Sequence, residues 1–330
     1  MRNFTFKGLF LTAVFMLLGC LSIQAANDDL ITKQITINLD KAGTLPNKIA
    51  SSEMYKITNL KIVGEINGTD WNMIREMAGR NYQESSTEGN LSVLDLSEAK
   101  IVAGGDYYYY DNLFNNKVYT SNDEIGEYAF AYCSGLTSLT LPVGITSIGE
   151  FAFSGCSGLT SLTLPAGITS IGEYAFSGCS GLTSLNLPAG ITSIDKYAFS
   201  GCSRLTSLTL PAGITSIGEF AFSYCSGLTS IYEYAEKVPR IGRYAFEGCA
   251  SRKCTLYVPK GTYDNYRLSE FGYFENIVEF DATGIDKTTT STDVEEVSRY
   301  SLNGQRLVGP TKGLNIVKYS DGSVKKVAVE

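Results

Sequence analysis

The sequence predicts a solenoid of 23-residue repeats, with a parallel β-sheet on one face and short helical or 3-10 turns on the other. Cysteines recur every 23 residues from Cys133 to Cys225, and Cys249 follows after 24. Leucines keep the same period, starting with Leu136, Leu139 and Leu141. Phenylalanines preceded by alanines form a further column at Phe130, Phe153, Phe176, Phe199, Phe222 and Phe246. Columns that agree at this many positions indicate a repeat architecture.

Each repeat unit is close to IGEYAFSGCSGLTSLTLPAGITS and is too short to bury its own apolar face, so the units must stack. In LTSLTLP the leucines alternate with polar residues, which predicts a strand that is buried on one face and ends at the proline. In AFSGC the phenylalanine and the cysteine are three residues apart, which suits one short inward-facing turn. Successive units should then lie about 4.8 Å apart, like neighbouring strands of a sheet.

The pattern LTSLTLPxGITSIGxxAFxxCSG resembles the BspA-like type of leucine-rich repeat, and six copies agree in register. The resemblance covers roughly residues 125 to 280, and it implies a leucine-rich repeat domain with its C-terminal cap. Proteins of that family are surface or secreted, and several act as adhesins towards host matrix proteins or neighbouring cells. The resemblance therefore implies a secreted or outer cell-surface location and a binding role.

Residues 1–25 are predicted to be a signal peptide, because a cationic start precedes an apolar stretch from Leu9 to Leu21 and Ala25 suits cleavage. The apolar stretch is shorter than the ~20 residues that span a bilayer, so we expect no transmembrane segment in the mature chain. The sequence Leu-Leu-Gly-Cys before Leu21 resembles a bacterial lipobox. Acylation of Cys20 is therefore an alternative to ordinary cleavage.

Residues 26–124 are predicted to form a mixed α/β capping region for the N-terminal end of the solenoid. The segments ITKQITINL, YKITNLKIVGEI and LSVLDLSEAKIV alternate as strands do, and a helix is expected over Asp70–Gly79 with Asp70 at its start. The run Tyr107, Tyr108, Tyr109 and Tyr110 is predicted to lie in a loop. Some of these tyrosines are expected to be exposed as contacts for proteins or sugars, and the alternative is that they cover the end of the solenoid.

The C-terminal part contains three further segments. Residues up to 280 are expected to close the solenoid, with Tyr263, Tyr266, Phe271, Tyr273 and Phe274 as core residues. The threonine-rich residues 281–296 are predicted to be a linker. Residues 297–330 show alternating stretches separated by hairpin signals and predict a small all-β domain, which resembles the C-terminal sorting domain of the type IX secretion system in Bacteroidetes.

The composition makes several function classes improbable. The formal net charge is -7 and basic residues form no cluster, so we expect no nucleic-acid partner. The chain has no histidine, which excludes Ser-His and Cys-His nucleophile pairs and histidine-containing zinc sites. We therefore expect no cofactor, no metal site and no catalytic residues, and we predict that the protein is not an enzyme.

Two further columns have plain structural interpretations. The repeating cysteines point into the core beside the phenylalanines, so we expect buried, reduced thiols rather than disulfides, with Cys249 and Cys254 as the pair most open to oxidation. A charged column is expected to be an exposed, solvated row rather than a calcium site. It contains Glu127, Glu150, Glu173, Lys196, Glu219 and Arg243.

The candidate binding residues lie at the outward positions of the repeat strands, where short polar side chains give a flat surface. They are Ser161, Thr163, Ser184, Asn186, Ser207 and Thr209 on the sheet, together with the tyrosine run and with Tyr232 and Tyr234 in the last repeat. The alternative is that serine and threonine are merely soluble residues compatible with a β-strand.

We predict an exported cell-surface protein that mediates adhesion by binding extracellular proteins or glycans of a host matrix or of neighbouring cells. One alternative is a surface-associated carbohydrate-active enzyme with two carboxylates about 5 to 9.5 Å apart in a pocket. The other is a purely structural surface component.

Overall fold

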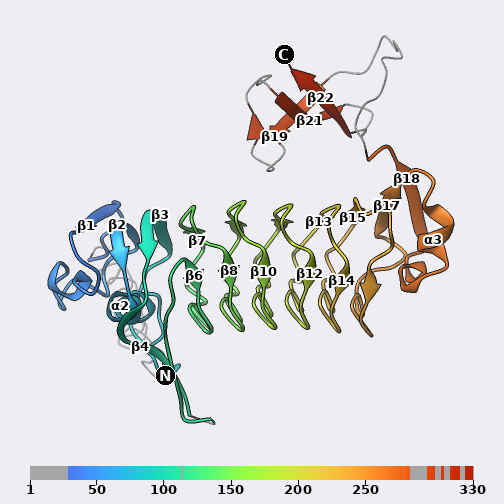
Figure 1. Ribbon diagram of the computed structural model, residues 1–330. Helices are drawn as coiled ribbons and strands as arrows, with labels where there is room; N and C mark the ends of the chain where they lie inside the picture. Colours follow the sequence, from blue (N-terminus) through green and yellow to red (C-terminus); the bar gives the residue numbers. More distant parts are fainter. Residues whose placement is uncertain are drawn as a thin grey trace, which may run out of the picture.

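The computed structural model describes residues 29–112, 114–282, 296–301, 306–307, 313–319 and 324–329. The predicted signal peptide, with Cys20, and residues 283–295 of the predicted linker lie outside the described residues. Figure 1 shows a stack of similar turns between an N-terminal and a C-terminal cap, followed by a small separate sheet. The predicted solenoid fold is confirmed.

The principal parallel sheet runs along the solenoid in two sections, ordered β1-β2-β3-β7-β9 and β11-β13-β15-β17-β18. Its strands are β1 (Ile35–Leu39), β2 (Asn59–Ile66), β3 (Val93–Ile101), β7 (Ser138–Thr140), β9 (Ser161–Thr163), β11 (Ser184–Asn186), β13 (Ser207–Leu210), β15 (Ser230–Glu233), β17 (Thr255–Pro259) and β18 (Asn276–Phe280). Equivalent residues of successive repeats pair directly, as Leu139 does with Leu162. The buried leucines therefore form continuous rows beneath the sheet.

A second parallel ladder, which the sequence did not predict, follows the ITSI segment of each repeat. Its strands are β6 (Glu124–Ile125), β8 (Ser147–Ile148), β10 (Ser170–Ile171), β12 (Ser193–Ile194), β14 (Ser216–Ile217) and β16 (Arg240–Ile241). They are ordered β10-β8-β6 and β12-β14-β16. Each strand has two residues, too few for alternation to be visible in the sequence.

The AFSGC segments form tight turns between the ladders, as predicted. The N–H of Cys156 donates to the carbonyl of Phe153 at 3.1 Å, a bond of the 3-10 type that recurs in each repeat. The phenylalanine rings lie inside and are stacked with centroids 5.0 to 5.4 Å apart. The rings therefore fill the space between the two ladders.

The cysteine column lies beside these rings, and the seven described cysteines are buried free thiols, as predicted. Each thiol from Cys156 to Cys249 donates to the carbonyl of a phenylalanine in the preceding repeat, at 3.0 to 3.4 Å. Burial raises the pKa of Cys156 and Cys179 well above the usual range. The column consists of small, hydrogen-bonded core residues.

The N-terminal cap contains η1 (Leu45–Asn47) and α2 (Gly68–Met77). The helix begins two residues before the predicted position, because Asn67 caps it and Asp70 completes a capping box. Asp70 is fully buried and also accepts from the N–H of Gly43 at 2.5 Å and of Leu45 at 2.8 Å. Its carboxylate thus joins the helix start to the preceding loop.

Side chains of this cap donate hydrogen bonds to main-chain carbonyls of the first repeat, because no preceding repeat is there to donate to them. The indole N–H of Trp71 donates to Ala129 O at 3.0 Å, and the guanidinium of Arg75 donates to the carbonyls of Tyr128 and Ala129. The hydroxyl of Tyr108 donates to Glu127 O at 2.8 Å. The main-chain carbonyls of Glu127, Tyr128 and Ala129 are therefore hydrogen-bonded.

The C-terminal cap comprises β17, α3 (Tyr263–Arg267), η2 (Glu270–Tyr273) and β18. Tyr266, Phe271 and Phe274 are buried, as predicted, and the hydroxyl of Tyr266 donates to Ala235 O at 2.7 Å. The prediction was wrong for Tyr263 and Tyr273, which are 41% and 46% exposed. Three inward aromatic rings are enough to cover the end of the phenylalanine column.

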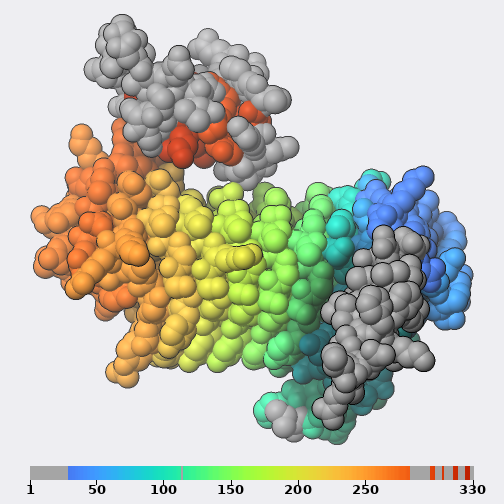
Figure 2. Space-filling view, turned by 180° about the vertical axis from the view of Figure 1, so that it is seen from behind, coloured from blue at the N-terminus to red at the C-terminus, as the bar shows by residue number. Residues whose placement is uncertain are grey.

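The C-terminal segment forms an antiparallel sheet ordered β20-β19-β21-β22, consistent with the predicted all-β character. Its strands are β19 (Glu296–Ser301), β20 (Arg306–Leu307), β21 (Gly313–Tyr319) and β22 (Val324–Val329). Arg299 is buried and donates to Asn315 Oδ1 at 3.2 Å. Lys326 Nζ donates to Ala282 O at 3.3 Å, which brings this sheet to the C-terminal half of the solenoid (Figure 2).

Among the described residues, no helix has the length and the apolar character needed to cross a membrane.

We expect Phe176→Ala to lower the free energy of unfolding by about 3 to 5 kcal/mol, because it leaves a cavity between two stacked rings in a middle repeat. Urea denaturation followed by circular dichroism measures the change. Ser161→Ala, on the exposed face of the sheet, is the control and should change stability by less than about 0.5 kcal/mol. Equal effects of the two substitutions would contradict the assignment of the core.

Thiol labelling should be slow in the native protein and rise sharply on unfolding, because burial both hides the cysteines and keeps them protonated. Reaction with a maleimide, mapped by mass spectrometry at Cys156 and Cys179, measures it. Rapid native labelling at these two positions would show that the column faces solvent.

Candidate binding surfaces

The outward face of the principal sheet is a flat polar surface. Ser161, Thr163, Ser184 and Asn186 are exposed, and Ser207 and Thr209 are half-buried. Within the described chain, the four exposed side chains make no hydrogen bond, so their donors and acceptors are available to a ligand. The structure places these six residues side by side on consecutive strands, as predicted.

An aromatic cluster ends this face at the C-terminal side. The ring of Tyr232 stacks on Tyr257 with centroids 4.6 Å apart, and Tyr234 meets Phe280 edge-on at 5.1 Å. Burial raises the pKa of both predicted residues, Tyr232 and Tyr234. The ammonium of Lys326 lies 4.9 Å from the centroid of the Tyr234 ring, which is cation–π range.

A cleft of about 240 Å³ lies between this aromatic cluster and the C-terminal sheet. Its lining includes Tyr232, Tyr234 and Tyr257 from the solenoid side, and Ile316 and Lys326 from the other side. The cleft can admit one side chain or one sugar ring in contact with the tyrosines. The two predicted tyrosines are therefore accessible from within a cleft at the C-terminal end of the sheet face.

The predicted tyrosine loop was wrong, because Tyr107 to Tyr110 belong to β4 (Gly104–Asp111), which pairs with β5 (Asn116–Thr120). Tyr108 and Tyr109 are buried, and Tyr107 and Tyr110 are half-buried. Neighbouring residues of a strand face opposite sides, so two consecutive buried tyrosines mean that both sides are covered. A strand that is covered on both sides has no alternation of apolar and polar residues, so its sequence did not indicate a strand.

Tyr108 and Tyr109 cover the N-terminal end of the solenoid, in agreement with the alternative interpretation. Tyr108 packs against Trp71, and Tyr109 stacks on Tyr128 with centroids 4.1 Å apart. The hydroxyl of Tyr109 donates to Glu84 Oε1 at 2.9 Å. Of the four predicted binding residues in the run, only Tyr107 and Tyr110 keep accessible surface beyond a few percent.

A second aromatic column, which the sequence analysis missed, lies outside the phenylalanine column. Its residues have a positive φ of 53° to 60° and are Tyr128, Phe151, Tyr174, Tyr197, Phe220 and Tyr244. Neighbouring centroids are 4.5 to 5.1 Å apart. The signal was present in the sequence, since every repeat has Tyr or Phe two residues before the core phenylalanine.

Tyr132 and Tyr224 stand where four other repeats have glycine, and they are 43% and 60% exposed. Both have a positive φ, and each ring leans on the glycine of the next repeat, Gly155 or Gly248. The replacement of glycine by tyrosine at these two positions could have identified exposed aromatic residues from the sequence alone.

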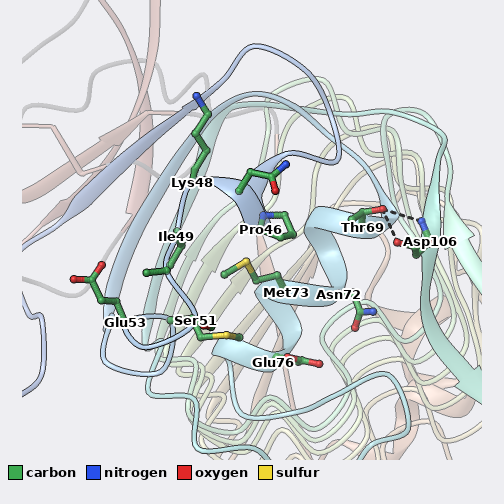
Figure 3. A pocket seen from close by; sticks show the side chains of 13 residues that line it. Pro46, Lys48, Ile49, Ser51, Glu53, Thr69, Asn72, Met73, Glu76 and Asp106 are labelled. Atoms are coloured by element: carbon green, nitrogen blue, oxygen red, sulfur yellow. Dashed lines mark hydrogen bonds between the residues drawn. The ribbon is translucent and has the colours of Figure 1, made fainter.

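A hollow of about 740 Å³ lies on the N-terminal cap between η1 and α2 (Figure 3). Met73, Met54 and Ile49 form its apolar part. Glu53 and Glu76 also line it, but their carboxylates point away from each other (Figure 3). Glu53 and Glu76 therefore do not face each other as the two acids of a glycosidase would.

The other charged side chains of the described residues include possible metal ligands. Among the described residues, no group of three or more His, Cys, Asp or Glu side chains is placed to hold a metal ion. The predicted charged row is exposed except at Glu173, which is half-buried. Burial and the neighbouring Glu127 and Glu173 raise the pKa of Glu150.

Glu233 is a buried acid that the sequence analysis did not identify. It stands in β15 where the preceding repeats have leucine, as at Leu210, and it is fully buried. Its Oε1 accepts from the N–H of Ala235 at 3.0 Å, whereas Oε2 has no hydrogen-bond partner among the described residues. Burial raises the pKa of this carboxyl to about 8, so it is largely neutral at pH 7.

Comparison with known proteins is consistent with this geometry. Residues 123–253 match the family model of the BspA type leucine rich repeat region in six copies. The fold is a leucine-rich repeat solenoid. A search of curated proteins finds no significant match.

Several solved leucine-rich repeat structures are similar. A T. pallidum leucine rich repeat protein is 27% identical over 46% of this chain and 73% of its own, with a TM-score of 0.36. A leucine rich cell surface protein from Faecalibacterium prausnitzii is 23% identical over 68% of this chain, with a TM-score of 0.32, and the match spans 51% of its length. A leucine-rich repeat protein from Bacteroides ovatus is 23% identical over 49% of this chain and 59% of its own, with a TM-score of 0.26.

We expect stability to fall as the pH rises from about 4.5 to about 8, because the folded state keeps Glu233 protonated while the unfolded chain releases the proton. The contribution is fully present below the unfolded pKa and is lost above the folded one. A shift of this size corresponds to at most about 5 kcal/mol. Chemical denaturation at pH 5, 7 and 9 measures it.

Glu233→Gln should flatten this pH dependence, because the amide keeps the shape of the side chain and does not titrate. Glu150→Gln, in the exposed row, is the matched control and should keep most of the pH dependence of stability. The role of Glu233 would be refuted by the same pH slope in Glu233→Gln and the unchanged protein.

Proposed function

We propose that this leucine-rich repeat protein is exported to the outer cell surface and mediates adhesion by binding an extracellular protein or glycan. The observation that carries the proposal is the sheet face, where rows of hydroxyl and amide groups, unpaired on β9 and β11, end at the stacked tyrosines Tyr232 and Tyr257. Such a surface offers hydrogen bonds over several strands and a ring contact at one end. These features suit a broad partner surface better than a small substrate.

The contacts are individually weak. Hydroxyls on a flat sheet exchange bonds with water for bonds with the partner, so each contributes on the order of 1 kcal/mol or less. Many copies on one cell surface would compensate, because multivalent attachment raises the overall affinity without new contacts. The aromatic end is the place where one contact can contribute more, since tyrosines are enriched among residues that dominate binding energy.

The proposed localisation also rests on the sequence, through the predicted signal peptide at residues 1–25 and the sorting-like segment at 297–330. The similarity of the repeats to BspA-type repeats supports the same location. We propose no lipid anchor at Cys20, in preference to the alternative of lipoprotein processing. The predicted domain boundaries are part of this proposal.

We expect binding of the mature protein to arrays of matrix proteins and glycans to be lost in the double variant Thr163→Arg/Thr209→Arg. Both residues lie on the sheet face, and two large cations there would disturb any partner that covers it. Ser157→Arg/Ser203→Arg adds the same charge at exposed positions of the turn layer and should bind normally. Tyr232→Ser tests the aromatic end.

Equal loss in the two double variants would place the site elsewhere, and loss in neither would remove the sheet face from the proposal. Turnover of a bound glycan, followed by chromatography of the products, would favour the enzyme alternative. Circular dichroism melting curves of all variants should match that of the unchanged protein.

A further inference from the structure

The two layers of the solenoid end differently at its C-terminal side. The principal sheet continues past the last repeat through β17 and β18, which pair in register with β15. The turn layer stops at the last AFEGC segment, residues 245–249, with no further turn stacked on it. In Figure 1, α3 lies beyond the end of the sheet layer.

Three main-chain bonds join the turn layers at each of the five junctions between repeats. The first is typified by Tyr174 N to Lys196 O at 3.0 Å, the second by Phe176 N to Ala198 O at 2.7 Å, and the third by Gly178 N to Ser200 O at 2.7 Å. The donors always belong to the earlier repeat and the acceptors to the later one. The last repeat therefore presents three donors to whatever follows it.

These donors are the N–H groups of Tyr244, Phe246 and Gly248, and none of them has an acceptor within the described chain. The N-terminal end is different, because Trp71, Arg75 and Tyr108 supply side-chain donors to the carbonyls of Ala129 and Glu127. The C-terminal cap supplies no side-chain acceptor to this edge. Unpaired donors at alternate residues form the kind of edge that accepts an added chain.

A groove of about 650 Å³ runs along this edge. Its lining includes the apolar Ile241, Ala245 and Phe246 and the rings of Tyr244 and Tyr273, together with the charged residues Arg243, Glu247 and Glu270. Tyr244 is 51% exposed and is the last ring of the outer aromatic column, and the guanidinium of Arg243 lies 5.7 Å from its centroid. The inner position of a further repeat is already filled, since Phe271 and Phe274 cover Phe246.

We propose that this groove binds a segment of another protein, which adds its main chain to the turn layer in the turn conformation that a further repeat would have. Three carbonyl oxygens at alternate residues accept from Tyr244, Phe246 and Gly248. An aromatic side chain stacks on Tyr244, and a small residue follows it, as alanine does in the repeats. The site is separate from the sheet face and does not depend on its function.

Three properties favour this occupant. The row of N–H groups is a line of partial positive charge that carbonyl oxygens complement. The groove continues the interface by which each repeat already holds the next, so its shape fits a polypeptide chain. A second copy cannot stack end to end, because the carbonyls of its first repeat are covered by Trp71 and Tyr108.

The test uses a peptide of residues 172–179 with Phe176→Ser, which leaves room for Phe274, and Cys179→Ser. We expect the full-length protein to bind it with a dissociation constant on the order of 0.1 to 1 mM, as a few main-chain hydrogen bonds and one ring contact allow. Amide hydrogen exchange measured by NMR should slow at Tyr244, Phe246 and Gly248. A peptide that also carries Tyr174→Ser should bind about fivefold more weakly.

Tyr244→Asn removes the ring and keeps a residue that tolerates positive φ, so it should weaken peptide binding about fivefold. Tyr132→Asn makes the same change at an exposed, positive-φ position of the first repeat and should bind normally. Melting curves verify that both variants fold. The proposal is overturned if no exchange is slowed at saturating peptide, if protection appears on the sheet strands instead, or if the two variants bind equally. None of these outcomes bears on the arrays that test the sheet face.

Discussion

Main-chain hydrogen bonding between successive repeats is the constraint on which the rest of the structure depends. In the turn layer every repeat donates N–H groups to the carbonyls of the next repeat, as Phe176 does to Ala198. Beside the strands the N–H groups of the later repeat donate to the earlier one, as Thr183 does to Thr160. A stack of this kind cannot satisfy its own two ends, because buried polar backbone groups are costly when unpaired. The N-terminal cap exists to meet this requirement, and Trp71 and Arg75 are fully buried in doing so.

The outer aromatic column shows that stacking of the repeats can compensate for backbone strain. Residues such as Tyr174 adopt a left-handed backbone, which costs a residue with a side chain about 1 to 3 kcal/mol. Stacking of neighbouring rings contributes about 0.5 to 1.5 kcal/mol per pair, and the main-chain bonds of the turn layer add to it. The strain is therefore offset by contacts that exist only when the repeats are stacked. This dependence favours cooperative folding of the repeats.

The sequence predicted the parts of the fold that repeat, because each column was sampled six times. The leucine strands, the phenylalanine turns and the buried thiols all lie as expected. The β4 strand was not predicted, because a segment covered on both sides has no alternation and occurs once. Glu233 was not predicted either, since nothing in a single glutamate tells whether its column faces inward until Leu210 and Val258 are aligned with it.

The candidate sites also divide into a part that repeats in the sequence and a part that occurs once. The polar sheet face could be predicted from the alternation of side chains in the strands, as at Thr163 and Asn186. The groove at Tyr244 could not be predicted, because the sequence does not show that the turn layer ends there with unpaired N–H groups. Uniform repeats make a uniform surface, and side chains that differ from their column therefore concentrate at the ends. Tyr232 and Glu233, next to each other in β15, replace the Thr or Asn and the Leu that the earlier repeats have at these positions. Tyr232 faces outward into a cleft and Glu233 is buried as a neutral acid, so two adjacent departures from the repeat change both the surface and the core at the end where distinctive contacts can form.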